Sequence, residues 1–442
     1  MNLSGASVAV VGMARSGHAA VELLLEKGAR VRAVDEKPTA ALAASLAALG
    51  VDLVPQSEAA LSGVELIVVS PGVPADLDLL QTARANGVKV IGDLELTGWF
   101  LKGPVIGITG SNGKTTTTAL TGHILQTASI DCQVGGNIGT APASMVNTSR
   151  DGRWNVLELS SFQLETIVDF RAQTAVALNV TDNHLDRHHT FANYAAAKAR
   201  LFETQQPGAN AVLNAVDATC VSYAARTKGT ATWFSSHTPI PNGWWLDQDG
   251  IVFQTIPVIA AREVQLRGRH NLENVMAAAA TAHLAGASLT QIANGIRTFA
   301  GVEHRLEFVR NVNGVDYYND SKATSVDATL KAIDAFAGGL WIILGGKDKN
   351  SDYTVLREPL RVKANAALLI GAALPVIEKQ LHGALPLIAC DTLDAAIVYA
   401  RTLAKPGDTV LFAPACASFD QFENFEHRGR VFKQLVHDMG TN

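Results

Sequence analysis

Short apolar runs alternate with stretches of helical spacing along most of the chain. Near the start, residues 7–12 (SVAVVG), 30–36 (RVRAVDE) and 88–93 (VKVIGD) are typical of strands, and 18–29 (HAAVELLLEKGA) is typical of a helix. Strands that alternate with helices predict an α/β fold with a parallel sheet. We therefore expect residues 1–93 to form a Rossmann-like domain with its ligand loops at the carboxyl ends of the strands.

The alternation continues in two further segments. Residues 94–299 contain apolar runs that each end in polar residues, then a β-rich stretch over 211–264 and the alanine-rich sequence 272–286, which predicts a buried helix. Residues 300–442 return to strand and helix alternation, which predicts a second Rossmann-like domain. The sequence thus indicates three α/β domains, with a mainly parallel sheet in the central one.

The stretch VIGITGSNGKTTTTALTGHIL, residues 105–125, has the order of a phosphate-binding loop: a strand, a glycine loop and a helix. Backbone N–H groups at a helix N-terminus attract anionic oxygens when glycines let the backbone come close. Ile108 stands where the common G-x-x-x-x-G-K-[ST] loop has its first glycine, so the loop is a shorter one. An ordinary glycine turn is disfavoured, because all three parts are in register. The expected nucleotide contacts are Gly110, Ser111, Asn112, Gly113, Lys114, Thr115 and Thr116.

A second glycine loop, residues 12–17, resembles the dinucleotide fingerprint G-x-G-x-x-G, but Ala14 replaces its middle glycine. Asp35 ends the next strand, where a ribose-binding acid belongs. One interpretation is half of an NAD site. The other is a site for the nucleotide part of a substrate, formed by Arg15, Ser16, Asp35, Glu36 and the turn from Ser70 to Gly72, although that turn is equally typical of a plain turn.

Polar residues follow the apolar runs of the central segment. Lys114, Asn137, Glu158 and His184 are expected to meet at one edge of the sheet, around a phosphate and a metal ion. A glutamate at the end of a buried strand needs such a role, because burial of an unpaired carboxylate is costly. A single histidine in a polar loop is usually solvated, His188 and His189 are predicted to be surface residues, and the helical Lys198 is ambiguous.

Composition limits the partners. The 442 residues carry a formal net charge of -5 and are 48% hydrophobic, with no long run of Lys or Arg, which argues against binding nucleic acid nonspecifically. The four cysteines are scattered, which argues against a zinc knuckle or a disulfide framework. Neither a signal peptide nor an apolar run long enough to cross a bilayer is visible, so we expect a cytoplasmic protein without membrane insertion.

Ordered motifs over essentially the whole chain resemble those of the Mur ligase family. They are TGSNGKTT, GGNIG, LELSSFQLE, NVTDNHLDRH, RHNLENVMAA, VEHRLEFV, NDSKATSVDAT, LGGKDKN and PACASFDQFENFEHRG. The resemblance implies a three-domain, ATP-dependent enzyme of peptidoglycan precursor synthesis and is closest to the members that add D-glutamate to UDP-N-acetylmuramoyl-L-alanine. It also implies that the first domain binds the UDP part of a substrate, and not NAD.

The resemblance further implies a mechanism, in which the γ-phosphate of ATP activates the substrate carboxylate as an acyl phosphate before the amine attacks to give a tetrahedral intermediate. Lys114, Lys322 and two Mg²⁺ ions would offset the repulsion between the two anions. By resemblance, Thr115 and Glu158 hold the first ion, and His184 with a carbamylated Lys198 surrounds the second. The same comparison assigns Asn271, Arg305 and Asp320 to ATP, Asn137 to the UDP side, and Thr324, Lys349, Ser418 and Phe425 to D-glutamate.

Two rival functions follow from the same motifs. One is another amide ligase of the Mur or folylpolyglutamate type, and the other is a regulatory protein that hydrolyses a nucleotide without joining two substrates. The sequence predicts only small-molecule partners, namely the uridine substrate, the amino acid and ATP, and we expect a monomer.

Overall fold

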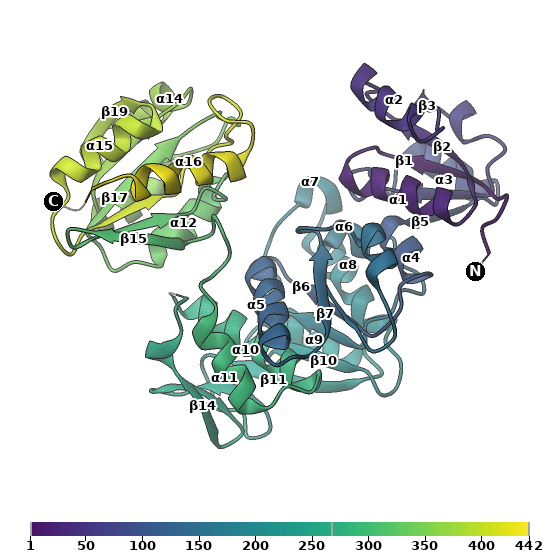
Figure 1. The fold of residues 1–442 in the computed structure, drawn as a ribbon, viewed down its shortest axis with the longest axis horizontal. Coiled ribbons are helices and arrows are strands. Elements are labelled where there is room, and N and C mark those ends of the chain that lie inside the picture. The colour runs from purple at the N-terminus through teal and green to yellow at the C-terminus, as the bar shows by residue number, and fades with distance from the viewer. Residues whose placement is uncertain (1, 267, 441–442) are drawn as a thin grey trace. The chain divides into compact units, whose positions relative to one another are not determined.

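The computed structural model describes residues 2–266 and 268–440. The chain divides into two compact units (Figure 1). The first comprises residues 1–264 and 269–299, and the second comprises residues 265–268 and 300–442. Three sheets lie in these units, two in the first and one in the second. The α/β class and the three-sheet organisation predicted from the sequence are confirmed, while the boundaries at 93/94 and 299/300 stay predictions.

The first sheet has the strand order β3-β2-β1-β4-β5, with parallel neighbours. Its strands are β1 (Ser7–Val11), β2 (Arg30–Asp35), β3 (Leu53–Pro55), β4 (Leu66–Val69) and β5 (Lys89–Gly92). Its helices are α1 (Arg15–Glu26), α2 (Ala40–Ala47), α3 (Asp78–Ala85) and α4 (Asp93–Gly98). Because strand order reverses at β1, the loops after β1 and β4 border one crevice, the usual ligand position in such sheets.

The central sheet runs β14-β13-β12-β11-β10-β9-β6-β8-β7 and is parallel except at β12, β13 and β14. Its strands are β6 (Val105–Thr109), β7 (Cys132–Gly136), β8 (Trp154–Glu158), β9 (Thr174–Ala177), β10 (Asn210–Asn214), β11 (Thr230–Ser235), β12 (Trp244–Leu246), β13 (Gly250–Phe253) and β14 (Ile256–Ala260). The helices are α5 (Lys114–Thr127), α6 (Ser161–Leu164), α7 (Leu185–His188), α8 (Phe191–Glu203), α9 (Ala218–Ser222), α10 (Arg269–Leu284) and α11 (Leu289–Thr298). Helices α5 and α10 pack side by side (Figure 1).

The third sheet, in the second unit, runs β15-β16-β20-β17-β18-β19, and only the pair β15 and β16 is antiparallel in the part of the chain that is described. Its strands are β15 (Glu307–Val312), β16 (Val315–Asn319), β17 (Leu340–Gly345), β18 (Ala364–Ile370), β19 (Leu387–Asp391) and β20 (Thr409–Phe412). Helices α12 (Val326–Asp334), α13 (Arg357–Lys363), α14 (Leu374–Leu381), α15 (Leu393–Leu403) and α16 (Phe425–His437) accompany it.

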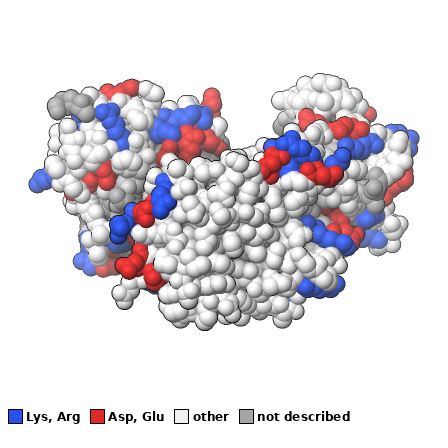
Figure 2. Space-filling model, turned by 60° about the horizontal axis from the view of Figure 1, so that its bottom comes forward, with Lys and Arg blue, Asp and Glu red and all other residues white. Residues whose placement is uncertain are grey.

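Local sequence explains where many helices begin. Side chains of Thr39, Ser160, Thr190, Ser288 and Asn424 accept a hydrogen bond from the first turn of the helix that follows each of them. On the face shown in Figure 2, basic and acidic residues are interspersed, and no continuous basic area is visible. Among the described residues, no helix is both long and apolar enough to cross a membrane.

Candidate functional site

The phosphate loop predicted from the sequence lies between β6 and α5. Gly113 is the residue before the helix and has a φ of 83°, in the left-handed region that favours glycine. A Cβ at this position would lie 2.1 Å from Oδ1 of Asn274, at the start of α10. Both the backbone conformation and the contact with Asn274 therefore require glycine here.

The loop is held from the opposite side by the segment that follows β9. The Asn112 N–H donates to Oδ1 of Asn179 at 2.9 Å, and the Asn179 side chain donates back to the Asn112 carbonyl at 3.2 Å. The Ser111 hydroxyl bonds the Thr181 carbonyl and the Tyr194 hydroxyl, both at 3.0 Å. These bonds fix the loop in shape, so its N–H groups need little reorganisation to bind an anion.

Lys114 begins α5, and its side chain folds back over the loop. Its Nζ donates to the Gly110 carbonyl at 2.9 Å and to the Ser111 carbonyl at 3.0 Å. The hydroxyl-bearing Thr115 and Thr116 that follow it are buried. The cation and the hydroxyls thus stand together at the helix N-terminus, as phosphate and Mg²⁺ binding requires.

Glu158 ends β8 and is 2% exposed. Its Oε1 accepts from Nδ2 of Asn137 at 2.8 Å, whereas its buried Oε2 lacks a hydrogen-bond partner among the described residues. An orphaned carboxylate oxygen at a strand end fits a metal ligand. No cluster of three or more His, Cys, Asp or Glu side chains suited to a metal occurs in the described residues, so the remaining ligands would be hydroxyls, phosphate and water, as Mg²⁺ prefers.

Lys198, on α8, is 1% exposed and lies beside the phosphate loop. Its Nζ donates to the Gly110 carbonyl at 2.9 Å and stands 4.5 Å from the centre of the Tyr194 ring. Burial lowers the pKa of Lys198 well below its usual range, and the nearby Lys114 charge adds to this shift. Partial desolvation of the ring, together with the charges of Lys114 and Lys198, also lowers the pKa of His184. Lys114, His184 and Lys198 therefore share one electrostatic neighbourhood.

His188 corrects an expectation from the sequence. It was predicted to lie on the surface, but it is 5% exposed, while His189 beside it is exposed as predicted. Its Nε2 lies 3.0 Å from the Ser161 hydroxyl, and its ring stacks on Phe162. Burial lowers the pKa of His188 to about 4, so the ring is neutral near pH 7.

A cavity of about 540 Å³ lies at the strand-order reversal of the first sheet and extends to β7 and α6. All the residues predicted to bind the UDP part of a substrate line it: Arg15, Ser16, Asp35, Glu36, Ser70, Gly72 and Asn137. Asp35 accepts the N–H groups of Met13 at 2.7 Å and Lys37 at 2.8 Å, so its carboxylate also holds the loop in place. The structure brings these residues together, and their role in binding stays a prediction.

The first glycine loop shows why only some of its positions need glycine. A Cβ on Gly17 would lie 1.9 Å from the Gly12 carbonyl oxygen, so α1 can approach the loop only without a side chain there. Ala14 has a φ of -70°, which any residue adopts, and it precedes the first residue of α1. The substitution of the middle fingerprint glycine is therefore compatible with the loop conformation.

Asp93 is a buried residue behind this cavity that the sequence analysis did not single out. Its Oδ1 accepts the Leu94 N–H at 2.9 Å, and its Oδ2 has no partner in the described structure. Burial raises the pKa of Asp93 to about 6, while the hydrogen bond from the Leu94 N–H and the nearby polar side chains of Ser16 and Gln163 act in the opposite direction. Asp93, beside the cavity-lining residues Ser16 and Gln163, is thus a carboxyl group that is costly to ionise.

We expect Asp93→Asn to stabilise the protein at pH 8. Between the unfolded pKa of 3.8 and the folded value of about 6, the folded state binds more protons, so the unfolding free energy falls as pH rises. Asparagine does not ionise, so this fall is absent in the variant. We expect its unfolding free energy to exceed that of wild type by on the order of 2–3 kcal/mol at pH 8 and to equal it at pH 3.5. Denaturant unfolding at both pH values measures it. Glu95→Gln is the control and should destabilise, because the buried Glu95 carboxylate accepts N–H groups through both oxygens.

In the second unit, the predicted residues again follow strand ends. Lys349 Nζ lies 3.5 Å from the Thr324 carbonyl, and Lys322 Nζ lies 6.0 Å from the centre of the Phe425 ring. Burial raises the pKa of Asp320 to about 6, and the Arg305 charge opposes this shift. The remaining predicted residue, Ser418, is buried next to Ala417, whose carbonyl accepts from Lys347.

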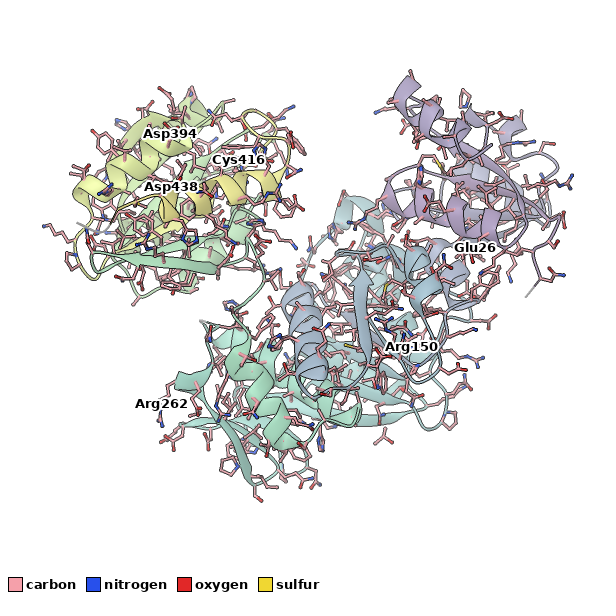
Figure 3. All side chains as sticks on the ribbon, in the orientation of Figure 1. Glu26, Arg150, Arg262, Asp394, Cys416 and Asp438 are labelled. Atoms are coloured by element: carbon pink, nitrogen blue, oxygen red, sulfur yellow. The ribbon has the colours of Figure 1, made fainter. Side chains whose placement is uncertain are left out.

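Arg428 is a further residue of this unit that the sequence analysis missed. It is 1% exposed, and its guanidinium donates to the backbone carbonyls of Ser321, Cys416 and Ala417 and to the Ser321 hydroxyl. Cys416 is marked in Figure 3. The loops after β16 and β20, which contain the predicted binding residues, are thus joined by one buried cation. The sequence offered one indication of its importance, because Arg428 lies within the FEHRG part of a motif shared with the family.

Comparison with known families gives three matches along the chain. The N-terminal domain described as Mur ligase MurD-like matches residues 6–92, the Mur ligase middle domain matches 108–282, and the Mur ligase glutamate ligase domain matches 304–416. Each match covers one of the three sheets in part or whole, and the order is that of the motifs quoted above.

Individual relatives agree. The UDP-N-acetylmuramoylalanine–D-glutamate ligase of Solibacter usitatus is 59% identical over 439 residues, covering 99% of both chains. The enzyme of the same name from Acidobacterium capsulatum is 49% identical, covering 99% of this chain and 97% of its own. Among solved structures, MurC of Thermotoga maritima has a TM-score of 0.59 at 17% identity, covering 98% of this chain and 99% of its own. The structure of MurF from the same organism in complex with ADP also has a TM-score of 0.59. It is 18% identical, and the match covers 98% of this chain and 96% of its own.

Proposed function

Since this chain belongs to the Mur ligase family, we propose that it is the ligase that joins D-glutamate to UDP-N-acetylmuramoyl-L-alanine at the expense of ATP. The observation that carries the choice of substrates is the full-length identity of 59% to a relative named for this reaction. The cavity lined by all the predicted uridine-side residues supports it. The proposal includes a cytoplasmic location, where ATP is available, and a monomeric enzyme.

The proposed reaction begins with transfer of the γ-phosphate of ATP to the carboxylate of the uridine substrate. Both reactants are anions, so positive charge must lie where they meet. Lys114 would leave the carbonyls of its own loop to contact the phosphates, while the N–H groups of residues 110–116 hold them. The amine of D-glutamate then attacks the acyl phosphate, and the tetrahedral intermediate loses phosphate to give the amide.

The site fits Mg²⁺. Thr115 and Glu158 would hold one ion beside the phosphates, because Oε2 of Glu158 is buried and has no other partner in the described structure. We propose a second ion near His184 and Lys198. When bound, Mg²⁺ would supply charge neutralisation and orientation of the transferring phosphate.

We also propose that Lys198 is carbamylated. Reaction of its neutral amine with CO₂ forms an N–C bond and releases one proton, turning a cation into a carboxylate-like ligand. Its burial beside the phosphate loop, with a carbonyl, a hydroxyl and an aromatic ring as its described contacts, disfavours the ammonium form. This would also remove a like charge next to Lys114.

The second unit would supply the remaining contacts. We propose that Asn271 of the first unit contacts the adenine, and that Arg305, Asp320 and Lys322 contact the phosphates and ribose of ATP. Thr324, Lys349, Ser418 and Phe425 would bind D-glutamate, with Lys349 paired to a substrate carboxylate.

The test is phosphate release from ATP with Mg²⁺ and UDP-N-acetylmuramoyl-L-alanine, comparing D-glutamate, L-glutamate, meso-diaminopimelate and L-lysine. We expect release only with D-glutamate. Release with another acceptor would reassign the pocket of the second unit to a different ligase. Phosphate release at the same rate with every acceptor, or with none, would instead support the protein that hydrolyses a nucleotide without joining two substrates.

A further inference from the structure

The contacts of Arg187 point to a role in positioning. We propose that Arg187 fixes the loop 70–74, which lines the uridine-side cavity, to the short helix α7, which follows directly after His184. This inference rests on the proposed function, because it gives Arg187 a part in orienting the uridine substrate relative to His184.

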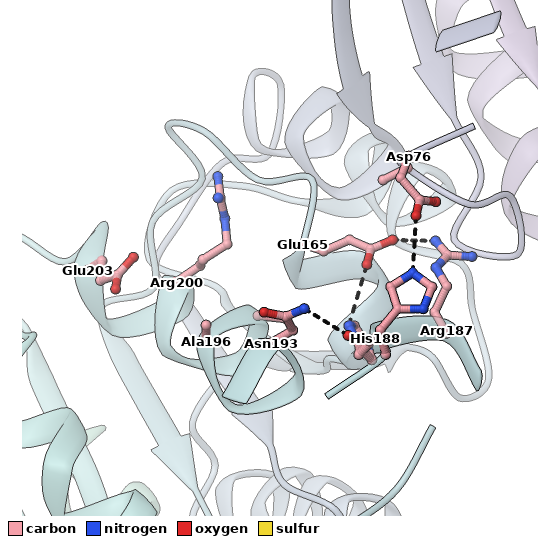
Figure 4. Close-up of a pocket in the computed structure, with 11 residues that line it drawn as sticks. Asp76, Glu165, Arg187, His188, Asn193, Ala196, Arg200 and Glu203 are labelled. Atoms are coloured by element: carbon pink, nitrogen blue, oxygen red, sulfur yellow. Dashed lines mark hydrogen bonds and ion pairs between the residues drawn. The ribbon is translucent and has the colours of Figure 1, made fainter. Parts of the chain in front are cut away.

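Arg187 is held between two parts of the first unit. Its Nη2 donates to the Val73 carbonyl at 2.7 Å and also pairs with Oε1 of Glu165. The side chains of Arg187 and Glu165 are 12% and 16% exposed, and they point toward one another in Figure 4. The guanidinium also lies 5.0 Å from the centre of the Phe162 ring. A planar cation that serves a carbonyl, a carboxylate and an aromatic face together is a role that lysine fills poorly.

The Val73 end of this link is part of the cavity wall. The Val73 N–H donates to the Ser70 carbonyl at 3.0 Å and closes the turn that follows β4. A Cβ on Gly12 would lie 2.5 Å from Cγ2 of Val73, so Val73 packs directly on the first glycine loop. Gly12, Ser70 and Val73 all line the cavity. Displacement of the Val73 carbonyl would therefore move the surface that faces the substrate.

The other end of the link is helix α7, residues 185–188. A four-residue helix has no independent stability, so contacts outside it must hold it in place. The preceding residue, His184, has a φ of 53°, and its ring lies 4.9 Å from that of Phe162. The same Phe162 ring contacts Arg187 and His188. Loss of the Arg187 side chain removes the charged contact of this group, and the Phe162 ring that lies against His184 loses a contact that holds it in place.

A matched control lies next to Arg187. His189 Nε2 is 3.3 Å from Oδ2 of Asp76, so this pair joins the same two parts of the first unit. Its side chains are 66% and 62% exposed, and exposed ion pairs contribute little. The two neighbouring pairs thus differ mainly in burial and in the bond to Val73.

The experiment compares Arg187→Gln, Arg187→Lys and His189→Gln in the full chain. Wild-type protein is first assayed for D-glutamate-dependent phosphate release. In Arg187→Gln we expect kcat/KM for the uridine substrate to fall about tenfold or more, with KM for ATP within about twofold. The Kd for UDP alone, from calorimetry, should rise by about threefold or more, because the loop 70–74 is released. Arg187→Lys should show the same pattern to a smaller degree, and His189→Gln none.

Thermal unfolding shows which variants are folded. Folded Arg187→Gln with all parameters within about twofold of wild type would overturn the inference, as would a fall in kcat alone with unchanged KM and UDP affinity. If Arg187→Gln does not fold, Arg187→Lys decides by the same criteria. If wild-type protein does not use D-glutamate, the proposed function fails. The change in UDP affinity then still tests whether Arg187 positions the loop.

Discussion

Lys114→Met is expected to lower kcat for D-glutamate-dependent phosphate release by about 1000-fold or more. The substitution removes the cation at the N-terminus of α5 and leaves an unbranched side chain that is one atom shorter. Two anions must then approach without it, and the charge that develops in phosphoryl transfer loses a partner. Lys114 donates to the carbonyls of Gly110 and Ser111, and we expect the fold to survive the loss of these two bonds. Steady-state kinetics and thermal unfolding measure the two effects.

The control for this variant is Thr118→Val, one turn further along α5. Thr118 is fully buried, and its hydroxyl has no hydrogen-bond partner in the described structure. Its removal should leave kcat within about twofold of wild type and not lower stability, because no bond is lost. If Lys114→Met kept a tenth of wild-type kcat, Lys114 would not have the proposed role at the phosphates.

Lys198→Met should reduce kcat by about 1000-fold or more while leaving the protein at least as stable as wild type. The loss follows if a carbamate on Lys198 binds the second Mg²⁺, because methionine cannot provide that oxygen ligand. The stability follows from burial: Nζ has only carbonyl, hydroxyl and ring contacts in the described structure, so an apolar side chain of similar volume removes a polar group that is costly to bury. Steady-state kinetics should therefore show a large fall in kcat, while thermal unfolding shows an unfolding temperature that is unchanged or higher.

Carbamylation itself is measured by carbon-13 NMR in labelled bicarbonate. We expect a carbamate signal in wild-type protein that is absent from Lys198→Met and present in Lys114→Met. Active wild-type protein without such a signal would exclude the carbamate, and the ligand would then have to be another group. Lys198→Met with near-normal kcat would exclude Lys198 from the metal site altogether.

The fold was largely predictable, because its signals are local. The apolar runs at 7–11, 105–109 and 340–345 are parallel strands, and glycines lie in the loops that follow them, which are the loops predicted to bind ligands. The expectation that polar residues at strand ends meet is confirmed for Asn137, which contacts Glu158. Lys198, which the sequence pattern left ambiguous, meets Lys114 at Gly110. Such contacts follow from topology, since parallel strands end at one edge.

The remaining parts of the site depend on contacts between residues distant in sequence. Helix α7 is too short to show a periodic pattern, so the burial of His188 under Phe162 could not be inferred from spacing. Arg187 meets Val73 across 114 positions, and Arg428 meets Ser321 across 107. In both cases a basic residue in a polar stretch is typical of a solvated surface. Only the tertiary structure shows that each is a buried cation bonded to backbone carbonyls.

The carboxylate of Glu95 has a consequence for cooperativity of folding. It stands in α4, after the last strand of the first sheet, yet it accepts the N–H groups of Val168, Asp169 and Phe170 in the middle of the chain. If it separates from them, three donors and a buried anion lose their partners together, so a partly melted state is strongly disfavoured. We therefore expect the first unit, which contains two of the three sheets, to unfold as one block and to lose the cavity of about 540 Å³ only as a whole.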